Sequence, residues 1–156
     1  MFILPDLSVS EIILALETDT TVFPVGALLR LFTNNITPTK STVRADLTEL
    51  TNAEVPGYVA VALAWNGTPV RKQDGSWEDL GGIVSFAAAG GPPPTPQIVY
   101  GWMLTNAAGT VLQGAGMFDV PFTFVQDGDG FALEPLLNVD QVSGSNIVVK
   151  LDMEVE

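Results

Sequence analysis

Short apolar runs, separated by glycine, proline, asparagine and aspartate, fill the chain from residue 22 onward. Several runs alternate between two kinds of side chain, which is the period-two pattern of a strand that buries one face. The predicted strands are 26–33, 57–65, 82–87, 97–105, 111–118, 122–125, 131–137 and 146–155. The turns between them include Asn66-Gly67, Asp74-Gly75, Asn106–Gly109 and Asp127–Gly130. This spacing predicts an all-β fold, either an antiparallel β-sandwich or a jelly-roll-like barrel.

The first 21 residues follow a different pattern. Ser8 and Glu11 have the spacing of a capping box, in which the serine caps a helix and the glutamate reaches back. Apolar side chains then recur on one helical face, at Ile12, Ile13 and Leu16. We therefore expect a short N-terminal helix, with a strand over the same residues as the alternative. The predicted organisation is an N-terminal helical or arm segment, residues 1–21, followed by a β-sandwich domain, residues 22–156.

Two long connections interrupt the predicted strands. Residues 34–56 are mostly polar, and Ser41-Thr42 can cap a single helical turn through residues 44–47. Residues 88–96 hold most of the stretch AAAGGPPPTP, whose prolines cannot donate to a sheet and favour an extended loop. Long loops in compact domains usually have a functional or quaternary role. We therefore expect both loops, together with residues 1–7, to contact partners.

Charge and composition narrow the possible functions. The net charge is −12, from 18 acidic and 6 basic residues, so we expect neither nucleic acid nor a membrane surface as a direct partner. No apolar stretch approaches the ~20 residues that span a bilayer, and the N-terminus lacks the basic region of a secretory signal. Cysteine and histidine are both absent. Disulfides and thiolate chemistry are therefore excluded, and the commonest general base and zinc ligand are missing.

Two acidic clusters invite a chemical interpretation. Asp127–Gly130 resembles the start of a calcium loop, but Phe131 and Asn138 stand where that loop needs an acidic ligand, so a hairpin turn explains it better. Glu78 and Asp79, near Asp74, would have to flank one sugar bond to hydrolyse it. Neighbouring residues of a strand point to opposite faces, so this pair is not expected to converge. We predict no metal, no cofactor and no enzymatic activity.

The aromatic residues have two possible roles. A sugar-stacking platform or a filled core would each use rings of this kind: Tyr58, Trp65, Trp77, Tyr100 and Trp102. Period-two spacing predicts that Tyr100 and Trp102 share one sheet face. Core packing is the favoured role, and exposure of Trp65 or Trp77 would favour binding instead.

Four of the six basic residues lie in two loops, as Lys40 and Arg44, then Arg71 and Lys72. On a surface that is otherwise acidic, they are candidates for pairing with acidic patches on neighbouring copies. Scattered solubilising charge is the alternative, since each exposed pair adds only ~0–1 kcal/mol.

The order of motifs over Leu29–Phe124 resembles a group of small virion proteins of tailed bacteriophages. The shared pattern runs LRLFTNNITP, then Thr-Glu and Gly-Tyr, then the strand IVYGWMLT. These motifs are turns and core positions, so no active residue carries over. The resemblance implies a structural part of a phage particle, made in the host cytoplasm, which decorates or cements the capsid or lies in the tail.

We therefore predict a non-enzymatic homo-oligomer of the virion that buries apolar surface against its own copies and against capsid or tail proteins. The alternative is a carbohydrate- or receptor-binding module of a tail fibre. A carboxylate-based hydrolase has no support from residue spacing. The predicted interface residues are Phe2, Ile3, Leu4, Lys40, Arg44, Arg71, Lys72, Pro92, Pro93 and Pro94.

Overall fold

The structure is a computed structural model that describes residues 27–65, 70–142 and 146–156. The predicted N-terminal helix, its capping box and the turn at Asn66-Gly67 lie outside these residues. So do the predicted interface residues Phe2, Ile3 and Leu4.

Four antiparallel strands make the first sheet, in the order β2-β1-β6-β7. Their bounds are β1 Leu28–Phe32, β2 Val61–Ala62, β6 Gln97–Thr105 and β7 Leu112–Phe124. The central strand β6 has apolar residues on both faces, and both faces are covered. Leu29 of β1 lies opposite Leu104, and Leu31 opposite Trp102, so these four side chains share the inner face.

The long strand β8 organises the second sheet. The bounds are β3 Val70–Arg71, β4 Trp77–Leu80, β5 Val84–Ala87, β8 Gly130–Val142 and β9 Asn146–Val155. Along one edge β8 pairs first with β5 and then with β4, while β9 pairs along its other edge. β3 pairs with the outer edge of β4.

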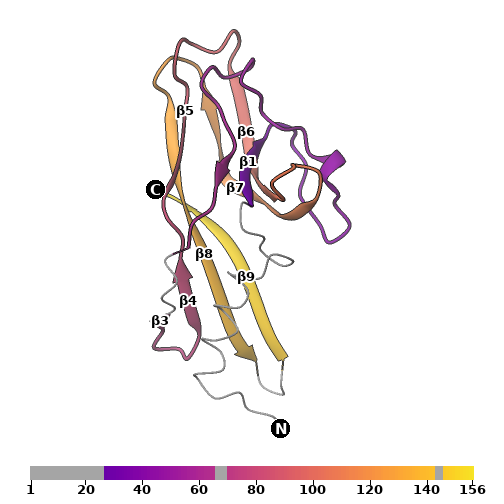
Figure 1. Ribbon diagram of the computed structural model, residues 1–156, viewed down its shortest axis with the longest axis vertical. Helices are drawn as coiled ribbons and strands as arrows, with labels where there is room; N and C mark the ends of the chain where they lie inside the picture. Colours follow the sequence, from indigo (N-terminus) through magenta and orange to yellow (C-terminus); the bar gives the residue numbers. More distant parts are fainter. Residues whose placement is uncertain (1–26, 66–69, 143–145) are drawn as a thin grey trace.

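The two sheets pack face to face only over part of β8, and Figure 1 shows the consequence. We call the two-sheet part the body. The second sheet continues beyond it as a projection that we call the ribbon: β3, β4, residues 136–142 of β8 and 146–152 of β9. The all-β prediction and the sandwich-like packing are confirmed. The described strands form no closed barrel, so the jelly-roll-like barrel is wrong.

The core of the body is a single cluster between the sheets. The first sheet contributes large side chains that are 0–4% exposed, namely Leu29, Leu31, Val99, Trp102, Leu104 and Phe124. The second sheet contributes Val84, Phe86, Leu133 and Met153 to the same cluster. Phe131 makes ring contacts with Phe86, Phe118, Phe122 and Phe124, which fill the space between β5 and the end of β7. A glycine at 116 leaves room for the indole of Trp102, because a Cβ there would lie 2.8 Å from the ring.

Tyr100 and Trp102 do not share a sheet face, contrary to the period-two prediction. The register of β6 against β7 shifts between Val99 and Gly101, where a bulge changes the alternation. Trp102 therefore belongs to the core between the sheets, while Tyr100 packs on a smaller cluster on the outer face, formed by Phe32, Leu47 and Met103.

The body and the ribbon meet at a second bulge. Leu80 pairs with Leu136 and Val84 with Leu133, so three residues, 81–83, face two on β8. The Gly81 N–H donates to the Pro135 carbonyl at 2.7 Å, and a Cβ at Gly81 would meet the proline ring at 2.9 Å. Pro135 lacks an N–H, and in an extended strand that position points to the same side as its carbonyl. The missing donor therefore falls at the bulge, where the ladder is already interrupted.

Some predicted strands match the observed ones and others do not. Runs 97–105 and 146–155 are strands with those bounds. Of 57–65 only Val61–Ala62 is a strand, and the runs 111–118 and 122–125 overlap the single strand β7, Leu112–Phe124. The strands β3 and β4 were not predicted, because charged residues interrupt their apolar pattern.

Candidate functional site

The loop at 33–56 contributes to both sides of the first sheet: Leu47 joins the cluster on the outer face, whereas Leu50 and Val55 belong to the core between the sheets. Asn34 holds its ends together: its side-chain amide donates to the Asp46 carbonyl at 2.7 Å, and its side-chain oxygen accepts the Thr48 N–H at 2.8 Å. The Thr33 N–H also donates to the Thr48 carbonyl at 2.8 Å. The loop that begins at Asn34-Asn35 is therefore held in place by hydrogen bonds between Asn34 and residues 46–48.

The predicted helical turn is present as a short 3-10 helix, η1, at Arg44–Asp46. Its N-terminus differs from the prediction. The Val43 N–H donates to the Asp46 carboxylate at 2.8 Å, so Asp46 closes the turn from inside. Thr42 instead accepts the Thr39 N–H at 2.8 Å and shapes the preceding turn.

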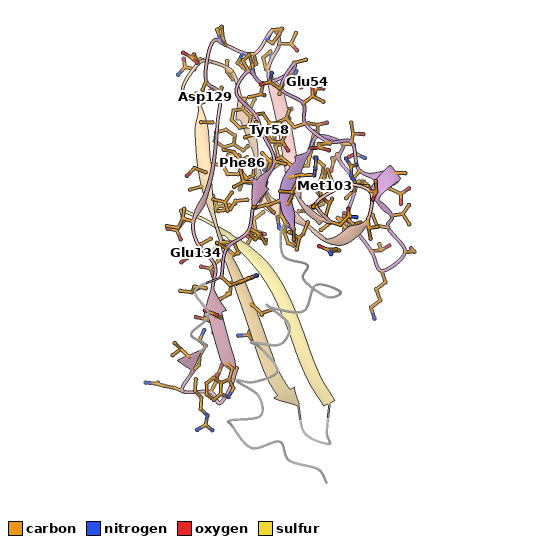
Figure 2. All side chains as sticks on the ribbon, in the orientation of Figure 1. Glu54, Tyr58, Phe86, Met103, Asp129 and Glu134 are labelled. Atoms are coloured by element: carbon orange, nitrogen blue, oxygen red, sulfur yellow. The ribbon has the colours of Figure 1, made fainter. Side chains whose placement is uncertain are left out.

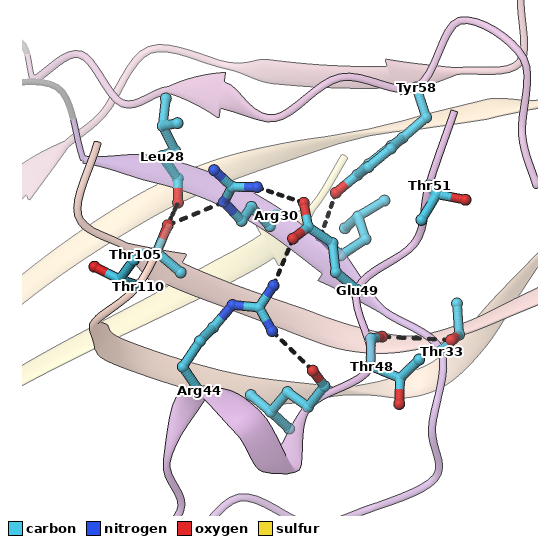
Figure 3. Close-up of polar contacts among 12 residues, drawn as sticks. Leu28, Arg30, Thr33, Arg44, Thr48, Glu49, Thr51, Tyr58, Thr105 and Thr110 are labelled. Atoms are coloured by element: carbon cyan, nitrogen blue, oxygen red, sulfur yellow. Dashed lines mark hydrogen bonds and ion pairs between the residues drawn. The ribbon is translucent and has the colours of Figure 1, made fainter. Parts of the chain in front are cut away.

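A carboxylate between two guanidinium groups fixes this loop to the sheet (Figure 3). Glu49 accepts from Arg30 at 2.6 Å and from Arg44 at 2.5 Å, and all three side chains are only 16–23% exposed. Arg30 also donates through Nε to the Thr105 hydroxyl at 3.0 Å, and Arg44 to the Leu47 carbonyl at 2.9 Å. We call Arg30, Glu49 and Arg44 the arginine clamp. Arg44, predicted as an interface residue, is thus engaged within the chain.

Tyr58 completes the free edge of β1. Its hydroxyl accepts the Leu31 N–H at 2.9 Å, and the Leu50 N–H donates to the Leu31 carbonyl at 3.0 Å. The ring stacks on Phe86 in the body, where Figure 2 shows both side chains. Burial raises the pKa of Tyr58 to about 12, so the phenol stays neutral. Tyr58 therefore has a structural role, in which its hydroxyl accepts a hydrogen bond from β1 and its ring packs in the core.

The proline-rich loop lies at the end of the body remote from the ribbon (Figure 1). Pro92 and Pro94 are exposed, while Pro93 is buried. Its neighbour is the Asp127–Gly130 turn: the Ala88 N–H donates to the Asp129 carbonyl at 2.8 Å, and the Gly91 N–H to the Asp127 carboxylate at 3.1 Å.

The interpretation of Asp127–Gly130 as a tight turn is confirmed, but it is not a hairpin, because β7 and β8 belong to different sheets and do not pair. The Asp129 carboxylate accepts the Val125 N–H at 2.7 Å and the Gln126 N–H at 2.9 Å. These backbone donors, with that of Gln126 first, hold the pKa of Asp129 below its usual value. The carboxylate is used to close the turn between β7 and β8.

The four basic residues do not form one site. Lys40 is exposed beside a groove of about 510 Å³ between residues 38–42 and residues 112–115 of β7. Arg71 and Lys72 lie on the ribbon instead. Lys72 pairs with Glu78 at 2.6 Å, and this hydrogen bond raises the pKa of Lys72. The two basic loops of the sequence therefore lie on different parts of the molecule.

Glu78 and Asp79 point to opposite faces of β4, as predicted. Glu78 pairs with Lys72, whereas Asp79 is only 2% exposed. Among the aromatic residues, core packing is confirmed for Trp102 and Tyr58, which are 4% and 6% exposed. Trp65, Trp77 and Tyr100 are half-buried. Within the described ranges, no group of three or more acidic residues is arranged to hold a metal ion.

A groove that was not predicted opens where β7 approaches β9. Between Val99 and Gly101, β6 is opposed by a four-residue excursion of β7 from Phe118 to Pro121. The groove has a volume of about 580 Å³ and is lined by Met117, Phe118, Asp119, Val120, Met153, Glu154 and Val155. Phe118 and Met153 are buried, whereas Val120 is 79% and Val155 59% exposed. We call this the β7–β9 groove. Its sequence signal is Asp119-Val120-Pro121, an interruption between two apolar runs.

An acidic group lies beside this groove. The pKa of Glu134 is raised, first by a hydrogen bond with Glu156 and then by burial and by the charges of Glu156 and Glu154. Figure 2 shows Glu134 where the ribbon joins the body. The groove therefore combines an apolar floor with an acidic surrounding.

No family model, curated protein sequence or solved structure matches the chain. Among the residues that the structure describes, no helix has the length and apolar character needed to cross a membrane.

Proposed function

We propose that the chain is a non-enzymatic structural protein of a phage particle, which decorates or cements the capsid as an oligomer. The observation that carries this proposal is the β7–β9 groove, where Val120 and Val155 are exposed above the buried Phe118 and Met153. Large exposed apolar side chains grouped at one place mark protein contacts. The sequence resemblance to small phage virion proteins supports the same role.

The polar groups of the body support a structural role as well. The arginine clamp, the Asp129 turn and the Asn34 bridge are each engaged in shaping loops. The acidic rim of the groove, Asp119 and Glu154, suits a partner surface with an apolar centre and basic edge. The shell protein of the particle is the proposed partner, and repeated copies on a lattice turn a modest contact into strong avidity.

Immunogold labelling of purified phage particles tests the location. Label on the head surface supports the capsid role, whereas label on the tail moves the protein to a tail role. Absence from the particles overturns the proposal.

A matched pair of variants tests the contact surface. Val120→Asp places a charge in the groove and should abolish co-sedimentation with particles stripped of the protein. Val59→Asp, at a residue that is 65% exposed elsewhere on the body, should bind like the unmodified chain. Equal binding by both variants would show that the groove is not the contact. Light scattering at several concentrations gives the oligomeric state of each protein.

A further inference from the structure

The 33–56 loop covers only part of the outer face of the first sheet. Leu47 forms a cluster there with Met103, and the half-buried Tyr100 and Met117 pack against it. The Thr37 hydroxyl donates to the Met117 sulfur at 3.3 Å, which ties the loop to β7 at this point. The cover on the outer face therefore lies over the second half of β6 and the first half of β7.

The same face stays apolar beyond this cluster, but its side chains are exposed. Ile98 of β6 lies opposite Thr123 of β7. Both point outward by strand alternation, because Val99 and Phe124 beside them belong to the core between the sheets. Ile98 is 42% and Val125 55% exposed. We call the exposed outer-face residues here the β6–β7 patch: Pro96, Ile98, Thr123 and Val125.

Hydrogen bonds within the chain hold the backbone around this patch. The Gln97 side-chain amide donates to the Thr95 carbonyl at 3.2 Å and to the Thr95 hydroxyl at 2.9 Å. The Val125 N–H donates to the Asp129 carboxylate at 2.7 Å. Pro96 ends the proline-rich loop, at the end of the body remote from the ribbon (Figure 1). Because these segments are already ordered, a partner that binds here does not have to order them.

The patch lies in an uncharged part of a strongly acidic chain. Residues 92–105 and 120–126 contain no charged side chain, whereas the net charge is −12. Two copies with this net charge repel each other over most of their surfaces. In an isologous contact the same patch meets itself across a two-fold axis. An uncharged apolar patch can do so without placing carboxylates opposite each other.

The β7–β9 groove differs from the patch in this respect. Asp119 and Glu154 line the groove, so two copies that met there would bring like charges together. The groove therefore suits a basic partner, whereas the patch suits a second copy of the chain.

We propose that the β6–β7 patch is the contact between copies of this chain, which pack outer face to outer face across a two-fold axis. The inference rests on the oligomer of the proposed function and names the face that forms it. Ile98 and Val125 supply the apolar centre of the contact. The patch is smaller than the about 800 Å² per partner of a standard interface, so the dimer should dissociate on dilution. Avidity strengthens the contact where many copies share one particle.

Sedimentation velocity of the purified chain over a dilution series tests the contact. The unmodified chain should change from dimer to monomer on dilution. In Ile98→Asp/Val125→Asp, association should weaken by about a hundredfold or more, because each copy brings two carboxylates into the contact. Ile83→Asp is the matched control, at a residue of the second sheet that is 61% exposed, and it should associate like the unmodified chain. A double variant that associates like the control would overturn the proposal.

Methyl NMR of the unmodified chain gives a second readout that needs no variant. With Ile and Val methyl groups labelled, dilution should shift the resonances of Ile98 and Val125. The resonances of Ile83 and Val59, which are exposed elsewhere, should not move. A chain that is monomeric at every concentration, or dilution shifts confined to other residues, would overturn the proposal.

The double variant also separates this contact from the contact with the shell. If it loses co-sedimentation with stripped particles while its self-association is unchanged, the patch binds the shell and the proposal is overturned. The sedimentation and NMR results do not depend on where immunogold label falls. Failure of the two-fold contact and failure of the virion role are therefore distinguishable.

Discussion

The body and the ribbon share strand β8 but differ in how their faces are covered. In the body the inner face of β8 meets the first sheet, and Leu47 of the 33–56 loop packs on the outer face of the first sheet. In the ribbon, among the residues that the structure describes, no second sheet faces the same side of β8. The comparison shows that alternation along one strand specifies which side is apolar, while the layer that buries it depends on the rest of the chain.

The largest expected effect concerns the core of the body. Phe124 is 0% exposed and contacts Phe122 and Phe131, so Phe124→Ala should lower the free energy of unfolding by about 3–5 kcal/mol. Urea unfolding measures the loss. Val120→Ala is the control and should change stability by less than ~0.5 kcal/mol, because its side chain is exposed. If Phe124→Ala loses no more stability than Val120→Ala, the two-sheet core is not the main source of stability.

The ribbon should respond locally to the loss of a buried leucine. Leu137→Ala is expected to cost about 2–3 kcal/mol, near the lower end for a leucine truncated in a core. Hydrogen exchange should accelerate in residues 136–142 and 146–152 while β1 and β6 keep their protection. Equal acceleration throughout the chain would mean that body and ribbon unfold as one unit.

The 33–56 loop is held to β1 by a half-buried charge, the carboxylate of Glu49. In Glu49→Gln the clamp loses its carboxylate, and Arg30 and Arg44 then face an amide that accepts through one oxygen only. The expected loss is about 1–2 kcal/mol, below that for a fully buried pair because all three side chains keep some exposure. Limited proteolysis should cut within 33–56 faster than in the unmodified chain. Lys40→Gln, in the same loop but exposed, should show no such change.

Tyr58 makes the stability of the folded chain depend on pH in the alkaline range. Its folded pKa of about 12 lies above the ordinary 10.0, so from pH 10 to 12 the folded chain holds a proton that the unfolded chain releases. Stability contributed by the neutral phenol is therefore fully present below pH 10 and declines as pH rises to 12. Tyr58→Phe should flatten that decline and cost about 1–2 kcal/mol at neutral pH, because the Leu31 N–H loses its acceptor. Urea midpoints across pH 8–12 check both.

The smallest effect is expected on the polar face of the ribbon. Lys72→Ala removes the pair with Glu78, but Lys72 is 46% exposed and solvent screens the interaction. The urea midpoint should not change measurably. A clear shift would mean that the polar face holds the ribbon as firmly as its apolar face does.

The sequence indicates much of the fold but little of its assembly. The bounds of β6 and β9 follow from apolar alternation between strong turn signals, so they were predicted correctly. β3 and β4 were missed because Arg71, Glu78 and Asp79 obscure the apolar pattern. They are strands because β4 pairs with the distant β8 and β3 pairs with β4. The bulge in β6 reversed the face of Tyr100, and no local signal marks it.

The candidate site was harder still to predict. The basic residues Lys40 and Arg71 were predicted as contacts in two separate loops, and the fold puts one on the body and the other on the ribbon. Arg44 is engaged by Glu49, a partner that depends on how the 33–56 loop closes. The β7–β9 groove depends on residues 117–120 and 153–155, which come from two strands separated by all of β8, so nothing in either run alone indicates it.

The bulge at Gly81–Ile83 has a mechanical consequence. β4 and β5 are separate pieces joined by three residues, whereas β8 and β9 run unbroken from the tip of the ribbon into the body. Their hydrogen bonds lie perpendicular to the strands, so a pull along the ribbon loads many of them together in shear. The β8–β9 hairpin is therefore the stiff part of the ribbon. Bending is expected on the side of β8 where β4 and β5 are interrupted.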